Sequence, residues 1–169
     1  MTASSPPPLS ERAAELVALL RLAPHPEGGF YREVFRSPQQ VQPADARAPR
    51  SALTTIDFLL ARGQFSAWHR VASDEAWHLL EGGPLRLWMI GPSLDTLESV
   101  ELDAAGPQHA ARHVVPAGWW QAAEPLGDYA LAGATVGPGF DFADFSFLRA
   151  DAAATAALRR LAPSLQRLA

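Results

Sequence analysis

Short apolar runs separated by glycine and proline fill most of the chain, and this punctuation limits the fold more than any other feature. The breaks include Gly63, Gly82-Gly83, Gly91-Pro92 and Gly137-Pro138. No helical pattern separates one run from the next, so parallel βαβ units are not expected. Many short strands at regular spacing predict an all-β sandwich or barrel. The predicted strands are residues 29–36, 53–61, 65–71, 75–81, 84–90, 97–102, 111–115, 119–123 and 129–136.

Helical patterns occur only towards the two ends of the chain. Leucines recur at helical spacing after Ser10, a residue type that caps helices, and Pro24 stops this first helix after about residue 22. An Ala-rich segment over 151–162 predicts a second helix, with Asp151 as its N-cap and Pro163 as its stop. We expect this C-terminal helix to pack on the outside of the strands.

The length and composition are those of one folded domain. The chain has 169 residues, of which 48% are hydrophobic and 19% charged. Residues 1–9 are rich in Ser and Pro and are expected to form a flexible tail, whereas residues 10–169 form a single domain. Residues 38–50 are expected to be a surface loop.

The residue types that are missing exclude several chemistries. The chain has no cysteine, which excludes disulfides, thiol catalysis and thiolate metal sites. All its basic residues are arginine, which excludes Schiff-base, pyridoxal-phosphate and P-loop lysines. The net charge of −4 argues against a nucleic-acid partner. Without a signal peptide or an 18-residue apolar run, the chain is expected to be cytoplasmic and not membrane-bound.

One segment combines polar residues with regular spacing. It runs from Gly63 to Gly82 with the pattern G-x5-H-x-V-x3-E-x6-G, in which the polar positions are His69 and Glu75. A second segment, P-x-G-x2-Q, begins at Pro116 and ends at Gln121. In a strand, residues two apart face the same side, so His69 and Val71 point into the barrel together. The turn after them brings Glu75 back beside them, and Gln121 approaches the same point.

These two segments resemble the two sequence motifs of the cupin superfamily. The first motif matches at every spacing, with Val71 in place of a histidine. In the second, glutamine stands at the histidine position and Ala110 at the position of a glycine. Further motifs around residues 25–33, 73–78 and 138–145 resemble the branch called cupin family five, small stand-alone cupins without a settled activity. The resemblance implies a double-stranded β-helix, or jelly-roll barrel, with short terminal helices, and a homodimer.

The resemblance also implies a metal site, but with an incomplete set of ligands. Typical metal cupins use three histidines and one glutamate. Val71 has no lone pair, and the amide oxygen of Gln121 is a weak ligand for metals that prefer imidazole. The candidate ligands are therefore His69, Glu75 and Gln121, holding at most a weakly bound divalent metal. His78 is a further candidate if a bulge turns it inward.

Acid–base chemistry without a metal is the first hypothesis for the pocket. Metal-free cupin epimerases use a histidine base and a tyrosine acid. The matching base is His69, oriented by Glu75, and the chain has two tyrosines expected to border the pocket, Tyr31 and Tyr129, of which Tyr129 is the candidate acid. The expected reaction is a carbohydrate-type isomerisation or epimerisation.

Other residues are expected to bind the ligand, and two alternative functions stay open. The alternatives are a non-catalytic module that senses a small metabolite and a metal-dependent cupin enzyme. Under all three hypotheses the partner is a small molecule. The predicted ligand-binding residues are Gln121, His78, Tyr31, Trp119 and Arg32.

Overall fold

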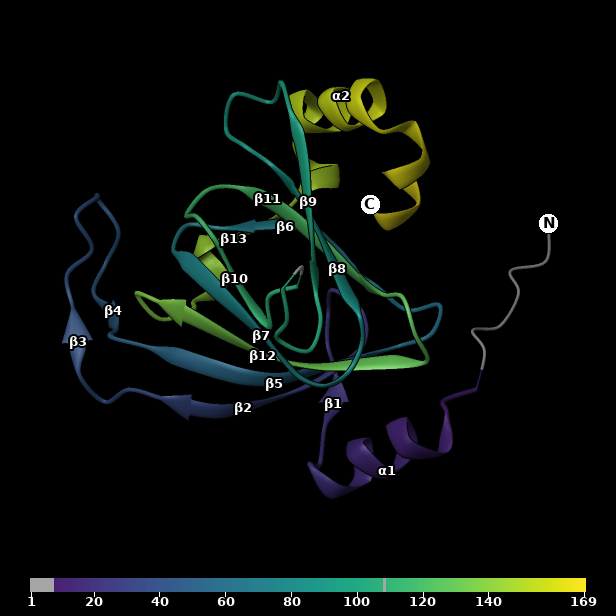
Figure 1. Ribbon diagram of the computed structural model, residues 1–169. Helices are drawn as coiled ribbons and strands as arrows, with labels where there is room; N and C mark the ends of the chain where they lie inside the picture. Colours follow the sequence, from purple (N-terminus) through teal and green to yellow (C-terminus); the bar gives the residue numbers. More distant parts are fainter. Residues whose placement is uncertain (1–7, 108) are drawn as a thin grey trace.

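Two facing antiparallel β-sheets, each covered on its outer side by one terminal helix, make up the molecule (Figure 1). The computed structural model describes residues 8–107 and 109–169. Most of the predicted tail, residues 1–7, therefore lies outside the described residues. The predicted all-β architecture with a short helix towards each end is confirmed.

The elements follow the predicted order closely. All nine predicted strands are present, with ends that differ by no more than two residues. The elements are α1 (Glu11–Leu19), β1 (Ala23–Pro24), β2 (Phe30–Arg36), β3 (Gln40–Val41), β4 (Arg50–Ser51), β5 (Thr54–Ala61), β6 (Ser66–Val71), β7 (Asp74–Gly82), β8 (Leu85–Ile90), β9 (Leu97–Leu102), β10 (Arg112–Val115), β11 (Trp120–Pro125), β12 (Tyr129–Gly137), η1 (Phe142–Asp144), β13 (Phe145–Phe147), η2 (Leu148–Ala150), α2 (Ala152–Leu161) and η3 (Pro163–Leu168).

The chain crosses repeatedly between the two sheets. One sheet has the strand order β1-β2-β5-β12-β7-β10 and the other β13-β6-β11-β8-β9. Thus β5 and β7 lie in the first sheet, whereas β6 and β8 lie in the second. The predicted turn between β6 and β7 is therefore a crossing between sheets, and His69 and Glu75 reach the interior from opposite walls.

Alternation along the strands divides the apolar side chains among three clusters. Phe58, Trp77 and Leu87 belong to the cluster between the sheets. Trp68 and Trp120 pack instead with α2 and η3, outside the second sheet. A third cluster joins α1 to the outer side of the first sheet. Because Trp68 faces outward, its neighbour His69 faces inward.

The helix caps are those that the sequence predicts. The Ser10 side chain accepts a hydrogen bond from the amide of Ala13, and Asp151 accepts one from Ala154. The predicted surface loop at 38–50 contains the small pair β3–β4. A pattern of apolar residues does not reveal two-residue strands of this kind, because such strands are defined only by their pairing with each other.

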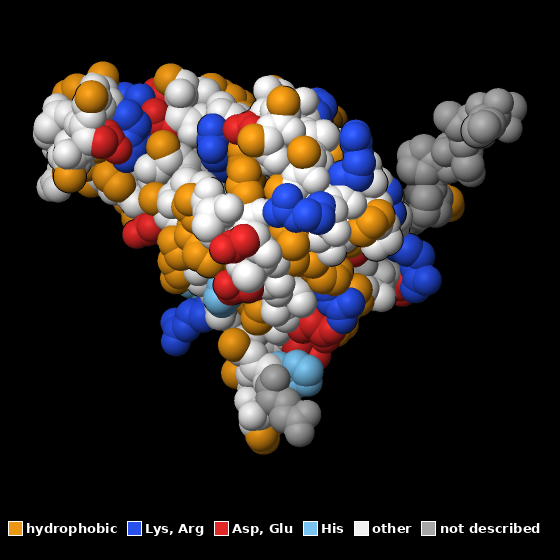
Figure 2. All heavy atoms as spheres, turned by 90° about the horizontal axis from the view of Figure 1, so that it is seen from above, with side chains coloured by type: hydrophobic (Ala, Val, Ile, Leu, Met, Phe, Trp, Pro, Cys, Tyr) orange, Lys and Arg blue, Asp and Glu red, His pale blue; other side chains and the backbone are white. Residues whose placement is uncertain are grey.

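A buried carboxylate fastens this loop to the segment before β13. Asp144 accepts hydrogen bonds from Arg47 at 3.0 Å and from Arg50 at 2.8 and 2.9 Å. Other arginines also have carboxylate partners. On the face drawn in Figure 2, arginines of the described residues are scattered among acidic and apolar side chains.

A tight turn before β2 brings the N-terminal segment against the second sheet. Its hydrogen bonds run from His25 N–H to the carbonyl of Gly29 and from Gly28 N–H to the carbonyl of His25, each at 3.0 Å. Gly28 has φ +113°, and a Cβ there would lie 2.2 Å from the carbonyl oxygen of Phe65. Only glycine fits this position without moving the backbone.

Replacing this glycine should therefore destabilise the fold. We expect Gly28→Ala to lower the free energy of unfolding by about 2 kcal/mol or more, from backbone strain and the clash with Phe65. Gly118→Ala is the matched control, because Gly118 has φ +77° and a Cβ added there would meet no atom within 4 Å. Urea denaturation measures the free energy of unfolding of both variants. Equal losses of stability in the two variants would contradict the role of the contact with Phe65.

Candidate functional site

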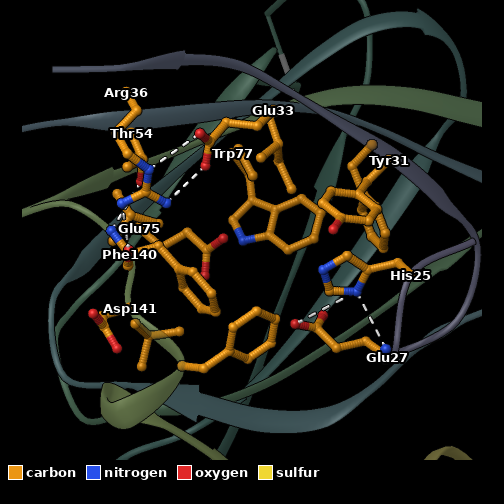
Figure 3. Close-up of a pocket in the computed structure, with 16 residues that line it drawn as sticks. His25, Glu27, Tyr31, Glu33, Arg36, Thr54, Glu75, Trp77, Phe140 and Asp141 are labelled. Carbon is orange, nitrogen blue, oxygen red and sulfur yellow. Dashed lines mark hydrogen bonds and ion pairs between the residues drawn. The ribbon is translucent and has the colours of Figure 1, made fainter. Parts of the chain in front are cut away.

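A cavity of about 520 Å³ lies on the inner side of the first sheet, near the turn before β2 (Figure 3). Its wall combines aromatic and aliphatic side chains with several carboxyl groups. Most of the lining comes from β2, β5, β7 and β12, and the rest from the turn before β2, the end of β6 and the segment 140–142. The lining residues are His25, Glu27, Tyr31, Glu33, Arg36, Thr54, Ile56, Phe58, Val71, Glu75, Trp77, Ala134, Val136, Phe140, Asp141 and Phe142.

Glu75 is the most buried carboxyl group of this wall, with 7% exposure. Its Oε2 accepts a hydrogen bond from Gln121 Nε2 at 2.5 Å. Gln121 Oε1 in turn accepts one from Trp77 Nε1 at 2.9 Å. Among the described residues, Glu75 Oε1 has no hydrogen-bond partner. One oxygen of Glu75 is thus held by the protein, while the carboxyl group borders the cavity.

Two neighbouring strands bring Gln121 to this position. In the second sheet β11 pairs with β6, with Gln121 opposite His69. Glu75 and Trp77 are two apart on β7 in the facing sheet, so both side chains point inward. The predicted approach of Gln121 to His69 and Glu75 is therefore present, and it includes Trp77 as a fourth member.

His25 and Glu27 enter the cavity wall from the turn before β2 (Figure 3). The backbone N–H of Glu27 donates to His25 Nδ1 at 3.2 Å, which leaves the proton of the neutral ring on Nε2. Glu27 Oε2 accepts a hydrogen bond from Ser66 Oγ at 2.6 Å. Glycine-rich turn chemistry thus positions two ionisable groups.

His69 lies behind Glu27, with 1% exposure. Its Nδ1 is 2.7 Å from the carbonyl oxygen of Ala67 and 3.3 Å from Glu27 Oε2. Because both neighbours are acceptors, Nδ1 carries the proton and Nε2 keeps a lone pair. The ring stacks on Phe145 at a centroid distance of 5.3 Å. His69 is therefore a held, oriented imidazole rather than part of the cavity lining.

Burial moves these four groups towards their neutral forms. It raises the pKa of Glu75 to about 7. The charge of Glu27 also raises this pKa, whereas His69 and the hydrogen bond from Gln121 lower it. Burial also raises the pKa of Glu27, although His25 and Ser66 oppose it. The same effect lowers the pKa values of His69 and His25. Glu75 can therefore gain and lose a proton near neutral pH.

Of the other predicted site residues, the structure places only Tyr31 at the cavity. Tyr31 and Arg32 are neighbours on β2 and face opposite sides. Tyr31 points inward and packs edge-on against His25 at a centroid distance of 4.4 Å. Arg32 instead donates to Asp57 at 2.8 Å. The structure thus does not bring Arg32 to the cavity.

His78, Tyr129 and Trp119 also lie elsewhere. His78 alternates with Trp77 on β7 and faces the outer side of the first sheet, where it pairs across from Gly133. The Tyr129 hydroxyl donates to Glu81 at 2.7 Å, and its ring packs in the cluster beneath α1. Trp119 packs at the edge of the cluster between the sheets. Strand parity turns His78 and Tyr129 to the outer side of the first sheet, whereas Trp119 faces the interior but does not line the cavity.

The comparisons with known proteins agree with the fold and its motifs. The family described as "Cupin superfamily (DUF985)" matches residues 14–148. The chain belongs to this family. No curated protein matches this cupin.

Two solved structures resemble this cupin over nearly its whole length. A hypothetical protein from Leishmania major is 31% identical, with a TM-score of 0.80, over 93% of this chain and 98% of the other. A protein from Shewanella oneidensis is 30% identical, with a TM-score of 0.77, over 93% and 96%.

A more distant structure shares the fold alone. Oxalate decarboxylase from Bacillus subtilis is 15% identical, with a TM-score of 0.52, over 74% of this chain and 29% of the other. The jelly-roll cupin fold expected from the motifs is thereby confirmed. Among the described helices, none is both long and apolar enough to cross a membrane.

The side chains at the usual cupin metal position do not fit a metal site. Both polar atoms of the Gln121 amide are engaged, with Trp77 and with Glu75. Val71 offers no ligand atom, which leaves His69 and Glu75 alone. Within the described residues, no group of three or more His, Cys, Asp or Glu side chains is arranged to hold a metal.

Several cavity residues are not evident from the two motifs. His25 and Glu27 lie far before His69 in the chain, and only the family-five resemblance around residues 25–33 hints at them. Arg36 and Asp141 come from a strand end and a loop. What joins them is the sheet order, in which β2 and β12 flank β5.

The buried Glu75 should make stability depend on pH. Its pKa in the folded chain, about 7, lies above the ordinary value, so folding is favoured at low pH and loses stability as pH rises through 7. We expect wild type to lose roughly 3 kcal/mol relative to Glu75→Gln between about pH 4.5 and pH 8. Urea denaturation across this range measures the difference.

Glu98→Gln is the matched control, because it removes an exposed carboxylate on β9. The difference in the free energy of unfolding between Glu98→Gln and wild type should stay nearly constant with pH. Parallel profiles for wild type and Glu75→Gln would contradict a raised pKa at Glu75.

Proposed function

We propose that this cupin is a small-molecule enzyme that transfers protons on a ligand in the cavity, as a carbohydrate-type isomerase or epimerase does. The observation that carries the proposal is Glu75, which is buried on the cavity wall with one oxygen held by Gln121. A fixed carboxyl group in a sheltered pocket has the geometry of a general base. Cytoplasmic location and a homodimer belong to the same proposal.

Glu75 takes the proton from carbon and returns it. A group with a pKa of about 7 is present in both forms at neutral pH, as both half-reactions require. The bond from Gln121 directs one oxygen away from the substrate, so Oε1 is the reacting atom. This assigns the proton transfer to Glu75 instead of His69, which is buried behind Glu27 and does not line the cavity.

Tyr31 replaces Tyr129 as the proposed acid. Figure 3 shows Tyr31 directed towards the cavity, on the same wall as His25. A phenol can donate a hydrogen bond to a substrate oxygen as negative charge develops there. Tyr129 does not serve, because its hydroxyl is bound to Glu81 outside the cavity.

Exchange of carbon-bound hydrogen with solvent tests the proposal directly. The protein is incubated in D2O with a panel of neutral and amino aldoses and ketoses, and deuterium beside the carbonyl carbon is followed by NMR. We expect incorporation into at least one sugar, and a rate lower by about 100-fold or more in Glu75→Gln. Glu98→Gln should exchange at the wild-type rate.

Two results would contradict the proposal. Unchanged exchange in Glu75→Gln would remove Glu75 from the mechanism. Saturable binding of a sugar, measured by thermal shift, without deuterium incorporation would instead identify a non-catalytic binding module.

A further inference from the structure

The cavity lining carries more acidic than basic side chains. Its ionisable acids are Glu27, Glu33, Glu75 and Asp141, and its one guanidinium is Arg36. Since a cavity concentrates the field of its wall, an excess of carboxyl groups favours a cation over an anion.

The guanidinium of Arg36 is already engaged. It donates to the Glu33 carboxylate at 2.7 and 3.1 Å and to the carbonyl oxygen of Phe140 at 3.0 Å. The pair with Glu33 cancels in charge, which leaves Glu27, Glu75 and Asp141. A phosphate or carboxylate ligand would therefore meet several carboxyl groups, no free guanidinium on the described wall, and an imidazole, His25, whose pKa burial lowers.

The two buried carboxyl groups each keep an oxygen for a ligand. Glu75 is 7% exposed, and its Oε1 has no hydrogen-bond partner among the described residues. Glu27 uses Oε2 for Ser66, and its Oε1 lies 3.9 Å from His25 Nδ1, beyond hydrogen-bonding distance. Neither oxygen is buried without a partner in the way that Arg32 Nε is, so both stay accessible for a donor or cation bound in the cavity.

Aromatic rings line the same cavity in an unbroken series. Tyr31 packs edge-on against His25 at 4.4 Å, His25 against Phe58 at 5.3 Å, and Phe58 against Trp77 at 5.8 Å, all between ring centroids. Aromatic faces beside carboxylates are the usual surroundings of an organic ammonium group.

We propose that the cavity takes a small organic cation, an ammonium-bearing molecule whose charged group lies beside the carboxyl groups of Glu27 and Glu75 and against Tyr31 and Trp77. This proposal names a substrate class for the proposed function. It rests on the proposed function only in assuming that the ligand binds in this cavity. Burial raises the pKa values of Glu75 and Glu27 in the free chain, and a bound cation favours their charged forms. Anionic sugar phosphates and sugar nucleotides are disfavoured on the same grounds.

Matched probes of different charge test the inference. Isothermal titration calorimetry at pH 8 compares choline with its neutral isostere 3,3-dimethylbutan-1-ol, and benzylammonium with benzyl alcohol and benzoate. We expect at least one cation to bind about tenfold or more tightly than its neutral partner, and benzoate not to bind. Glu75→Gln should remove most of this preference, and Glu98→Gln should keep it.

Three results with the wild-type chain would overturn the inference. They are equal affinity for a cation and its neutral isostere, preferred binding of benzoate, and no binding of either cation. A cation preference that survives in both Glu75→Gln and Glu27→Gln would also overturn it, because the charge would then lie elsewhere. Thermal melts confirm that the variants are folded. Deuterium exchange into a neutral sugar would still support the proposed function, so the two failures are distinguishable.

Discussion

The hydrogen-bonded bridge from Trp77 through Gln121 to Glu75 joins the two sheets at the inner end of the cavity, and the site depends on it. Trp77 and Glu75 belong to β7 in one sheet, while Gln121 belongs to β11 in the other. An amide suits this place because it donates to Glu75 and accepts from Trp77 at once, which gives each of these two side chains a hydrogen bond. A hydrocarbon side chain at position 121 would leave the indole N–H and a carboxyl oxygen unpaired.

The same bridge occupies both polar atoms of the Gln121 amide. Amide atoms that serve neighbouring side chains are not free to serve an ion. What stays near the axis of the barrel is a set of two carboxyl groups and two imidazoles that burial keeps largely uncharged. Such a set exchanges protons readily, which is the property that the proposed proton transfer uses. It also accepts a charge brought by a ligand, which is the property that binding of an organic cation uses.

The strands and helix caps were predictable because their signals are local. Alternation, glycine–proline breaks and the capping residues Ser10 and Asp151 act within a few residues. The inward direction of His69 and the approach of Gln121 followed from spacing and resemblance. Tyr129 illustrates what spacing does not decide, since the side that a residue faces depends on where its strand begins and on which neighbour it meets.

Distance along the chain sets another limit to prediction. His25 and Glu27 join Glu75 through the turn at Gly28, whose contact with Phe65 is invisible in the sequence. Arg32 was predicted to bind the ligand, but the pleat turns it to the side of β2 opposite to Tyr31, where it pairs with Asp57.

The cavity draws its wall from the turn before β2, from β7 and from the segment after β12, which lie far apart along the chain. A nascent chain emerging from the ribosome therefore has no such pocket until its last strands have docked. Contacts of this kind form late and slowly in β-rich folds. Any molecule that binds in the pocket consequently stabilises the whole domain, because it binds completely folded chains and not partly folded ones.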